Sequence, residues 1–188
     1  MAEEYSLQDF IGDLDRITAT EKSAAAIVRQ AKPLLERLVR NPKALEERFK
    51  QRGPTAYGRY MLHRAPDFNV TAIVWGPGDG ARAHDHQTWG LVGVVENEIQ
   101  ETRFQRRDDG SKPGYAELEV VATLNNRAGM VSCLVPPNDD IHEMNNVTAR
   151  TTVEIHVYGD DLADMPRLRF DLETNTVKPF ASPKYDNC

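Results

Sequence analysis

Cysteine is scarce in this sequence. The 188 residues include two, Cys133 and Cys188, which have no close spacing. A small secreted domain held together by disulfides needs more cysteines than this, so no disulfide framework is expected. The pattern fits a reducing compartment, and we expect a cytoplasmic protein.

Long apolar runs and an excess of positive charge are also missing. No stretch approaches the roughly 20 apolar residues of a membrane helix. The first ten residues, MAEEYSLQDF, are acidic and lack the apolar part of a secretory signal. Lysine and arginine number 23 against 29 acidic residues, giving a net charge of -6. Because phosphate binding favours a basic face, we expect no nucleic-acid partner. The lack of a long apolar run leads us to expect no membrane partner.

Helical signals fill residues 6 to about 52. Apolar residues recur there at helical spacing, and residues that favour helix starts precede each run. The predicted starts are Ser6 for a first helix, Thr20 or Ser23 for a second, Pro33 for a third and Asn41–Pro42 for a fourth over residues 43–51.

Strand signals replace helical ones from about Tyr57 onward. The apolar period falls to nearly two, in short runs such as residues 90–104, and turns rich in Gly, Pro, Asn and Asp separate the runs. About eight short strands of this kind predict a mainly β fold, an antiparallel sandwich or jelly-roll barrel. We predict a single domain over residues 1–188, with a helical part (1–55) packed on the barrel (56–188).

Three of the five histidines stand in a recognisable pattern. His84 and His86 are two residues apart, so on a strand both imidazoles point to the same face and can reach one metal ion. Gly78 lies six residues before His84. Further on, Pro137, Asp139, His142 and Asn146 follow the spacing P-x-D-x2-H-x3-N. These two segments resemble the two motifs of the cupins, with Asp139 in place of a glycine, and we predict metal binding by His84, His86 and His142.

A ligand that most cupins supply is missing here. Their glutamate falls four or five residues after the histidine pair, where this chain has Gly90 and Leu91. Three neutral imidazoles and no carboxylate leave coordination positions open, which favours chemistry over a closed structural zinc site. Imidazole suits iron, zinc, copper and nickel, so the ligands alone leave the metal open.

Longer segments resemble the thiol dioxygenases of the cysteine dioxygenase family. They are WGPGDGARAHDHQTWGLVGVVENE, IHEMNN and IHVYG, and the closest branch resembles the bacterial 3-mercaptopropionate dioxygenases. The resemblance implies a cupin barrel, Fe(II) held by the three histidines, and a small thiol and O2 as substrates that give a sulfinic acid. It also places Gly90 where animal members have a cysteine that crosslinks to tyrosine, so no such crosslink is expected.

The resemblance also implies a catalytic group on one strand. His156 and Tyr158 match two members of a Ser-x-His-x-Tyr triad in the family, and Glu154 stands where the family has serine. Residues 154, 156 and 158 share a strand face, so a hydrogen-bond chain among them is geometrically possible. We take all three as catalytic candidates, and Glu154 is expected to change the usual proton network or to bind a substrate ammonium or hydroxyl.

Two arginines match carboxylate-binding positions of the family. Arg59 corresponds to the arginine of the cysteine dioxygenases and Arg167 to that of the mercaptopropionate branch. The guanidinium fork suits a carboxylate. Together they would suit a thiol with two carboxylates, such as mercaptosuccinate; alternatively Glu154 pairs with one of them, or either arginine is a surface ion-pair residue. His63 is expected to be a packed histidine, and Cys133 a core residue.

Other functions remain open from sequence alone. The chain could be a cupin dioxygenase for a non-thiol substrate, although IHVYG argues against it, or a non-catalytic metal-binding or regulatory cupin. A storage-like cupin usually has two barrels and has lost its histidines, which this chain does not match. Its length is compatible with a monomer or a small homo-oligomer.

Overall fold

The computed structural model of the chain describes residues 4–53, 57–137, 139–163 and 165–188. Its helices and strands, with one 3-10 turn (η1), run in the order α1 (Leu7–Thr20), α2 (Ala24–Val39), η1 (Glu47–Phe49), β1 (Gly58–Arg64), β2 (Asn69–Trp75), β3 (Gly80–His84), β4 (Gly90–Glu96), β5 (Glu98–Arg106), β6 (Leu118–Arg127), β7 (Val131–Leu134), β8 (Ile141–Asn145), β9 (Thr152–Tyr158), β10 (Arg167–Asp171) and β11 (Thr176–Phe180). The expected boundary between helical and barrel parts, at residues 55–56, reaches outside the described residues.

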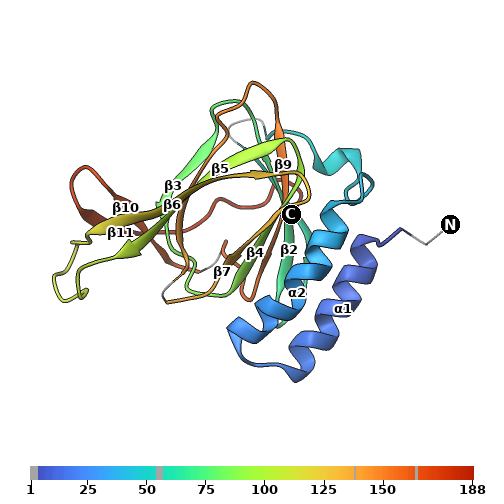
Figure 1. The fold of residues 1–188 in the computed structure, drawn as a ribbon, viewed down its shortest axis with the longest axis horizontal. Coiled ribbons are helices and arrows are strands. Elements are labelled where there is room, and N and C mark those ends of the chain that lie inside the picture. The colour runs from blue at the N-terminus through green and yellow to red at the C-terminus, as the bar shows by residue number, and fades with distance from the viewer. Residues whose placement is uncertain (1–3, 54–56, 138, 164) are drawn as a thin grey trace.

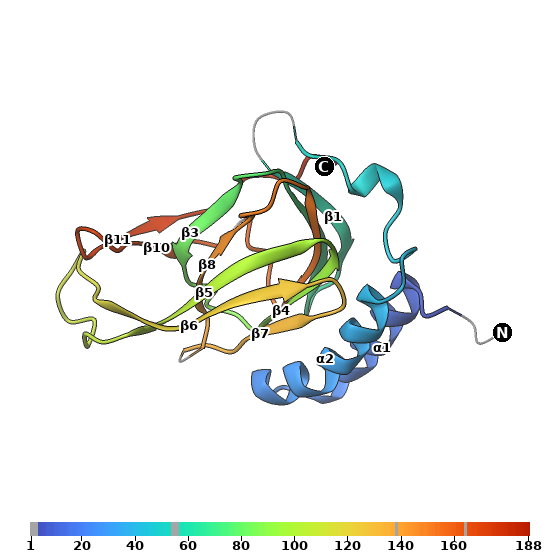
Figure 2. The same ribbon diagram turned by 45° about the horizontal axis from the view of Figure 1, so that its top comes forward.

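The strands form two antiparallel sheets. One has the order β1-β2-β9-β4-β7 and the other β11-β10-β3-β8-β5-β6. Figures 1 and 2 show the two sheets curved around a common interior, with both helices outside the five-stranded sheet. The predicted mainly β fold, two antiparallel sheets with a helical N-terminal segment packed on them, is confirmed.

Alternation along the central strands divides the interior into two cores. Strands β2 and β9 are buried along their whole length. Val153, Ile155 and Val157 of β9 join the core beneath the helices, whereas Tyr158 joins the core between the sheets. Because side chains alternate along a strand, residues 154, 156 and 158 all face the space between the sheets.

The first two helices begin where expected. Ser6 caps α1 and forms a capping box with Asp9, and Ser23 caps α2. The predicted helix start at Pro33 is wrong, because α2 continues through it. Pro33 lies on the exposed side of the helix, so the carbonyl that loses its amide partner remains accessible to water, while Leu35 and Leu38 on the other side are fully buried.

The predicted fourth helix over residues 43–51 is also wrong. The segment holds only the short η1 turn. Ala44 and Leu45, adjacent in sequence, are both buried in the core beneath the helices, and Asn41 fixes the preceding bend by donating from Nδ2 to the carbonyl of Tyr5 at 3.0 Å. The segment thus joins the core through Ala44 and Leu45 without forming a regular helix.

The β-rich run over residues 90–104 is divided between the two sheets. Strand β4 belongs to the five-stranded sheet and β5 to the six-stranded one. The chain passes from one to the other at Asn97, which has a positive φ of 64°. Such a conformation is compatible with asparagine and ends the extended run.

Among the described helices, none combines the length and apolar character needed to cross a membrane.

Helix α2 packs closely on the barrel, which gives a test of the single-domain prediction. Leu35 is fully buried, and a Cβ added at Gly93 of β4 would lie 3.1 Å from its Cγ. We expect Leu35→Ala to lower the free energy of unfolding by about 2–5 kcal/mol, because it leaves a cavity in a shared core. Both tryptophans lie in the barrel part, so their fluorescence and the far-ultraviolet circular dichroism of the helices should shift together in urea.

The exposed Gln30→Ala on the same helix is the control. A helical signal that melts separately, with the tryptophan transition unmoved, would contradict a single cooperative domain.

Candidate metal centre and its pocket

Three histidines meet at the middle strands of the six-stranded sheet, β3 and β8. His84 ends β3, His86 follows it, and His142 lies on β8, which pairs with β3 so that His84 stands opposite His142. Their ring centroids are 4.8 to 5.0 Å apart, and one nitrogen of each ring lies within 4.8 Å of the others. All three side chains are buried. The structure therefore brings the three predicted ligands together.

Hydrogen bonds fix which nitrogen each ring offers. Nδ1 of His84 lies 2.7 Å from the carbonyl oxygen of Arg82, and Nδ1 of His86 lies 2.9 Å from that of Asp140. Nδ1 of His142 lies 2.9 Å from Oε1 of Glu101. Carbonyl and carboxylate oxygens only accept, so each Nδ1 carries the hydrogen and Nε2 keeps the lone pair a metal needs.

The surroundings favour neutral rings. Burial, together with the neighbouring His142 and Arg167, lowers the pKa of His84 and of His86 well below the ordinary value. A neutral imidazole is the form that ligates a metal. Three buried imidazoles that share one focus fit a single metal ion with further positions left open.

Glu101 is a buried carboxylate that the sequence analysis did not identify. It lies on β5, is fully buried, and accepts hydrogen bonds from His142, Arg103, Ser132 and Asn126 at 2.7 to 3.0 Å. Burial raises its pKa, but the bonds from His142, Arg103 and Ser132 outweigh this and lower the pKa to about 2. One sequence signal could have identified Glu101 as buried: it lies two residues after the apolar Ile99, so on an alternating strand both side chains face the interior.

The predicted group on β9 forms a continuous chain of hydrogen bonds. Oε2 of Glu154 accepts from Nε1 of Trp75 at 2.6 Å and lies 2.9 Å from Nε2 of His156. Nδ1 of His156 lies 2.7 Å from the hydroxyl of Tyr158. Glu154 is fully buried, and burial raises the pKa of Tyr158, so its phenol stays protonated. The Tyr158 ring stacks on His86 with centroids 5.4 Å apart, which joins this chain to the histidine cluster.

Gly90 lies directly beside Tyr158. The two residues are paired between β4 and β9, and a Cβ at Gly90 would come within 2.8 Å of Cδ1 of the tyrosine ring. Glycine therefore leaves the space that the Tyr158 ring occupies.

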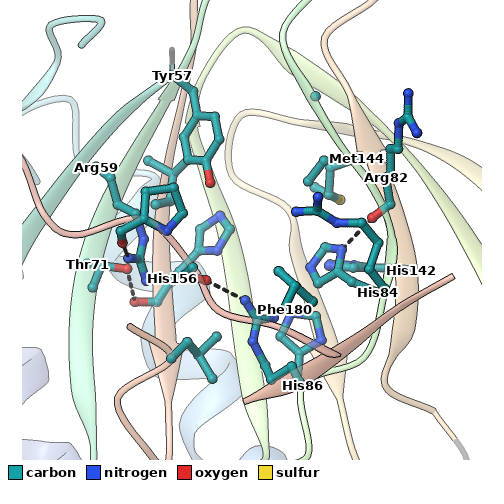
Figure 3. A pocket seen from close by; sticks show the side chains of 18 of the residues that line it. Tyr57, Arg59, Thr71, Arg82, His84, His86, His142, Met144, His156 and Phe180 are labelled. Carbon is teal, nitrogen blue, oxygen red and sulfur yellow. Dashed lines mark hydrogen bonds between the residues drawn. The ribbon is translucent and has the colours of Figure 1, made fainter. Parts of the chain in front are cut away.

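A cavity of about 270 Å³ contains both groups. His84, His86, His142, His156 and Tyr158 line it, as Figure 3 shows for the four histidines. Its described wall also holds four arginines and no aspartate or glutamate; the arginines are Arg59, Arg82, Arg167 and Arg169. A wall with this charge suits an anionic ligand.

The two predicted carboxylate-binding arginines are buried in this wall. Arg167 donates from Nη1 to the carbonyl of Asp85 at 2.9 Å and from Nη2 to the hydroxyl of Ser182, and it lies over the ring of Phe180. Its Nε is buried without a hydrogen-bond partner among the described residues. Arg167 thus lines the cavity with one N–H unpaired among the described residues.

Arg59 is more firmly engaged by the C-terminal segment. It donates to the carbonyl of Pro183 and lies over the ring of Tyr185, 4.2 Å from the centroid. The alternative that Glu154 pairs with an arginine is wrong, because Glu154 is bonded to Trp75 and His156. The alternative of surface ion-pair residues is wrong too, since Arg59 and Arg167 are only 6% and 3% exposed.

The remaining sequence predictions concern residues outside the cavity. His63 packs on Phe68, with ring centroids 5.4 Å apart, and does not join the histidine cluster. Cys133 lies on β7, half-buried against the core beneath the helices, and burial raises the pKa of its thiol. Both agree with a packing role.

Known proteins resemble this chain in sequence and in fold. The sequence profile of the family described as cysteine dioxygenase type I matches residues 13–170. Solved structures with a similar fold include TT1209 of Thermus thermophilus (14% identity, 60% of this chain and 91% of that one, TM-score 0.46). Others are an uncharacterized conserved protein with a double-stranded β-helix domain from Klebsiella pneumoniae (13%, 60% and 80%, 0.46) and a cupin superfamily protein from Desulfitobacterium hafniense (12%, 64% and 88%, 0.42).

The chain belongs to the cysteine dioxygenase type I family. The profile covers all three histidines of the cluster, the β9 group and both arginines. It ends before Phe180, Ser182 and Pro183, which also line the cavity.

The histidine cluster gives a direct test of metal binding. We expect His142→Ala to lose most of the Fe(II) that the unaltered protein retains after gel filtration, because it removes one of three Nε2 donors. His63→Ala is the matched control, since it deletes a partly buried imidazole outside the cluster. Metal analysis together with circular dichroism checks both. Equal iron retention in the two variants would contradict the predicted ligand set.

Proposed function

We propose that this protein is an Fe(II)-dependent thiol dioxygenase that adds both atoms of O2 to the sulfur of a small carboxylate-bearing thiol and releases the sulfinic acid. The observation that carries the proposal is a single cavity lined both by three imidazoles that share a focus and by arginines, with no aspartate or glutamate in its described wall. Membership of the cysteine dioxygenase type I family supports the reaction class.

The donor set fits iron, with His84, His86 and His142 as ligands. All three would offer Nε2, since each Nδ1 is held by a protein oxygen. When bound, Fe(II) would hold the sulfur as thiolate and supply the redox chemistry with O2. The chain's own residues bind, orient and exchange protons.

Arg167 is the proposed anchor for the substrate carboxylate. Two of its nitrogens are held by Asp85 and Ser182, which fixes the guanidinium, and its buried Nε–H has no partner among the described residues. A carboxylate oxygen placed there would satisfy that donor through a charge-assisted bond. Arg59, held by Pro183 and Tyr185, would add positive potential or a second contact.

The β9 group is the proposed proton acceptor. Glu154 accepts from Nε2–H of His156, so Nδ1 is free to accept the Tyr158 hydroxyl proton. When the thiol loses its proton, the Tyr158 oxygen can take it while its own proton passes to His156. Glu154 would then neutralise the resulting imidazolium.

The charges around the cavity favour an acid thiol without an amino group. A substrate ammonium would meet arginines and no carboxylate in the described wall, and Glu154 lies behind that wall, bonded to Trp75 and His156. We therefore rank 3-mercaptopropionate and mercaptosuccinate above L-cysteine, and cysteamine last. The resemblance to the mercaptopropionate branch points the same way.

A thiol panel tests the reaction and its substrate. The Fe(II)-loaded protein should consume O2 with 3-mercaptopropionate or mercaptosuccinate, with one sulfinate formed for each O2 consumed. Uptake should be weaker with L-cysteine and weakest with cysteamine. Absence of uptake with all four thiols, although iron is bound, would overturn the dioxygenase proposal and favour a non-catalytic metal-binding cupin.

Arginine variants test how the carboxylate is held. We expect Arg167→Ala to lower kcat/KM for the preferred acid thiol by about 10- to 100-fold, mainly through KM, because it removes a charged hydrogen bond. Arg59→Ala should have a smaller effect, since the C-terminal segment already engages its guanidinium. The exposed Arg107→Ala is the control for loss of one positive charge.

Steady-state O2 consumption at matched iron content measures these effects. An Arg167→Ala variant with the kinetics of Arg107→Ala would rule out Arg167 as the anchor.

A further inference from the structure

The three histidines are held by different kinds of acceptor. His84 and His86 donate from Nδ1 to main-chain carbonyls, of Arg82 and Asp140. His142 alone donates to a carboxylate, that of Glu101, at 2.9 Å. A carboxylate partner makes the bond charge-assisted and makes the imidazole a stronger electron donor to a metal.

We propose that Glu101 is a positioning residue of the metal centre, which orients His142 and supplies the negative charge that tightens metal binding at an otherwise neutral three-imidazole site. The inference rests on the proposed function, because it assumes that His142 ligates the metal. It assigns a role to a residue that contacts neither the cavity nor the substrate.

Strand pairing sets the position of Glu101 relative to His142. Strands β5 and β8 are adjacent, with Glu101 opposite Met144 and Arg103 opposite His142. Glu101 is therefore the diagonal neighbour of His142 across the sheet, within reach of its ring. The carboxylate is fully buried and His142 is 1% exposed, so water does not compete for this bond.

Three further donors fix the carboxylate in place. Oε1 also accepts from Ser132 at 2.9 Å and from Nη1 of Arg103 at 3.0 Å, and Oε2 accepts from Asn126 at 2.7 Å. Arg103 is itself tied to the carbonyl of Cys133 and to Asp139. Because these strands hold both oxygens, Glu101 cannot rotate, and the imidazole it holds keeps a fixed direction.

A purely structural role must be separated from this one. Glu101 is also the ion-pair partner of Arg103, and removing either member of a buried pair destabilises a protein. Stability alone therefore does not decide. Metal affinity and the spectrum of bound Co(II) report the donor strength of the ligands directly, and neither needs turnover or a thiol.

The experiment compares Glu101→Gln with two controls at neutral pH. The amide keeps an acceptor for His142 but removes the charge, and we expect Fe(II) affinity, measured by competition with a chelator, to fall by about 10- to 100-fold. The visible absorption bands of the Co(II)-loaded variant should shift. Glu98→Gln removes the same charge from the same strand at a surface ion pair and should leave both unchanged.

Ser132→Ala is the second control, because it takes one donor from Glu101 and none from His142. It should retain affinity within a few-fold and the Co(II) spectrum of the unaltered protein. Glu101→Gln with unaltered affinity and spectrum, or Ser132→Ala with an equal loss, would overturn the inference and leave the proposed function standing. Failure of the unaltered protein to bind Fe(II) or Co(II) would overturn both.

Discussion

The antiparallel pairing of β3 with β8 is the constraint on which the site depends. It sets His84 opposite His142, and His86 follows two residues after His84. Neither histidine segment makes a three-ligand site alone, because one supplies two imidazoles and the other supplies one. The barrel closes the space around them, buries all three rings and fixes every Nδ1 on a protein oxygen. The free energy for gathering three polar groups in an apolar interior comes from the surrounding fold.

The positive charge of the cavity wall is the second feature that shapes the site, because it determines which ligand charge the cavity favours. Two arginines are buried there although the described carboxylates do not pair with them, which is a costly arrangement unless other groups compensate. The compensation in this chain is partial and comes from neutral acceptors, Asp85 and Pro183 carbonyls and the Ser182 hydroxyl, and from the rings of Phe180 and Tyr185. Most of these come from the C-terminal segment beyond the family match. An anionic ligand is the best compensation for positive charge that the protein leaves unpaired. Burial of the two arginines therefore favours a negatively charged substrate.

Sequence patterns predicted most of the fold and part of the site. Capping residues predicted the helix starts at Ser6 and Ser23, and apolar alternation predicted the strands. The start at Pro33 was misjudged because burial of Leu35 and Leu38 holds α2 together on both sides of the proline, and residues 43–51 carry helix signals but form only the η1 turn. Motif spacing and the family resemblance were enough to predict the three clustered histidines, His156 and Tyr158. Glu101 was not, because its partner lies on another strand, and the Trp75–Glu154 bond depends on the pairing of β2 with β9. Contacts set by strand pairing leave little trace in one sequence.

Two fully buried carboxylates hold histidines on opposite sheets, yet the consequences differ because they take different ring nitrogens. Glu101 accepts from Nδ1 of His142, which leaves Nε2 with its lone pair directed at the histidine focus. Glu154 accepts from Nε2 of His156, which leaves Nδ1 directed at the Tyr158 hydroxyl. Under the proposed function, the carboxylate would strengthen a donor to the metal in the first case and prepare the ring to receive a proton in the second. The position of a carboxylate around the imidazole would then separate the histidine that binds metal from the one that transfers a proton.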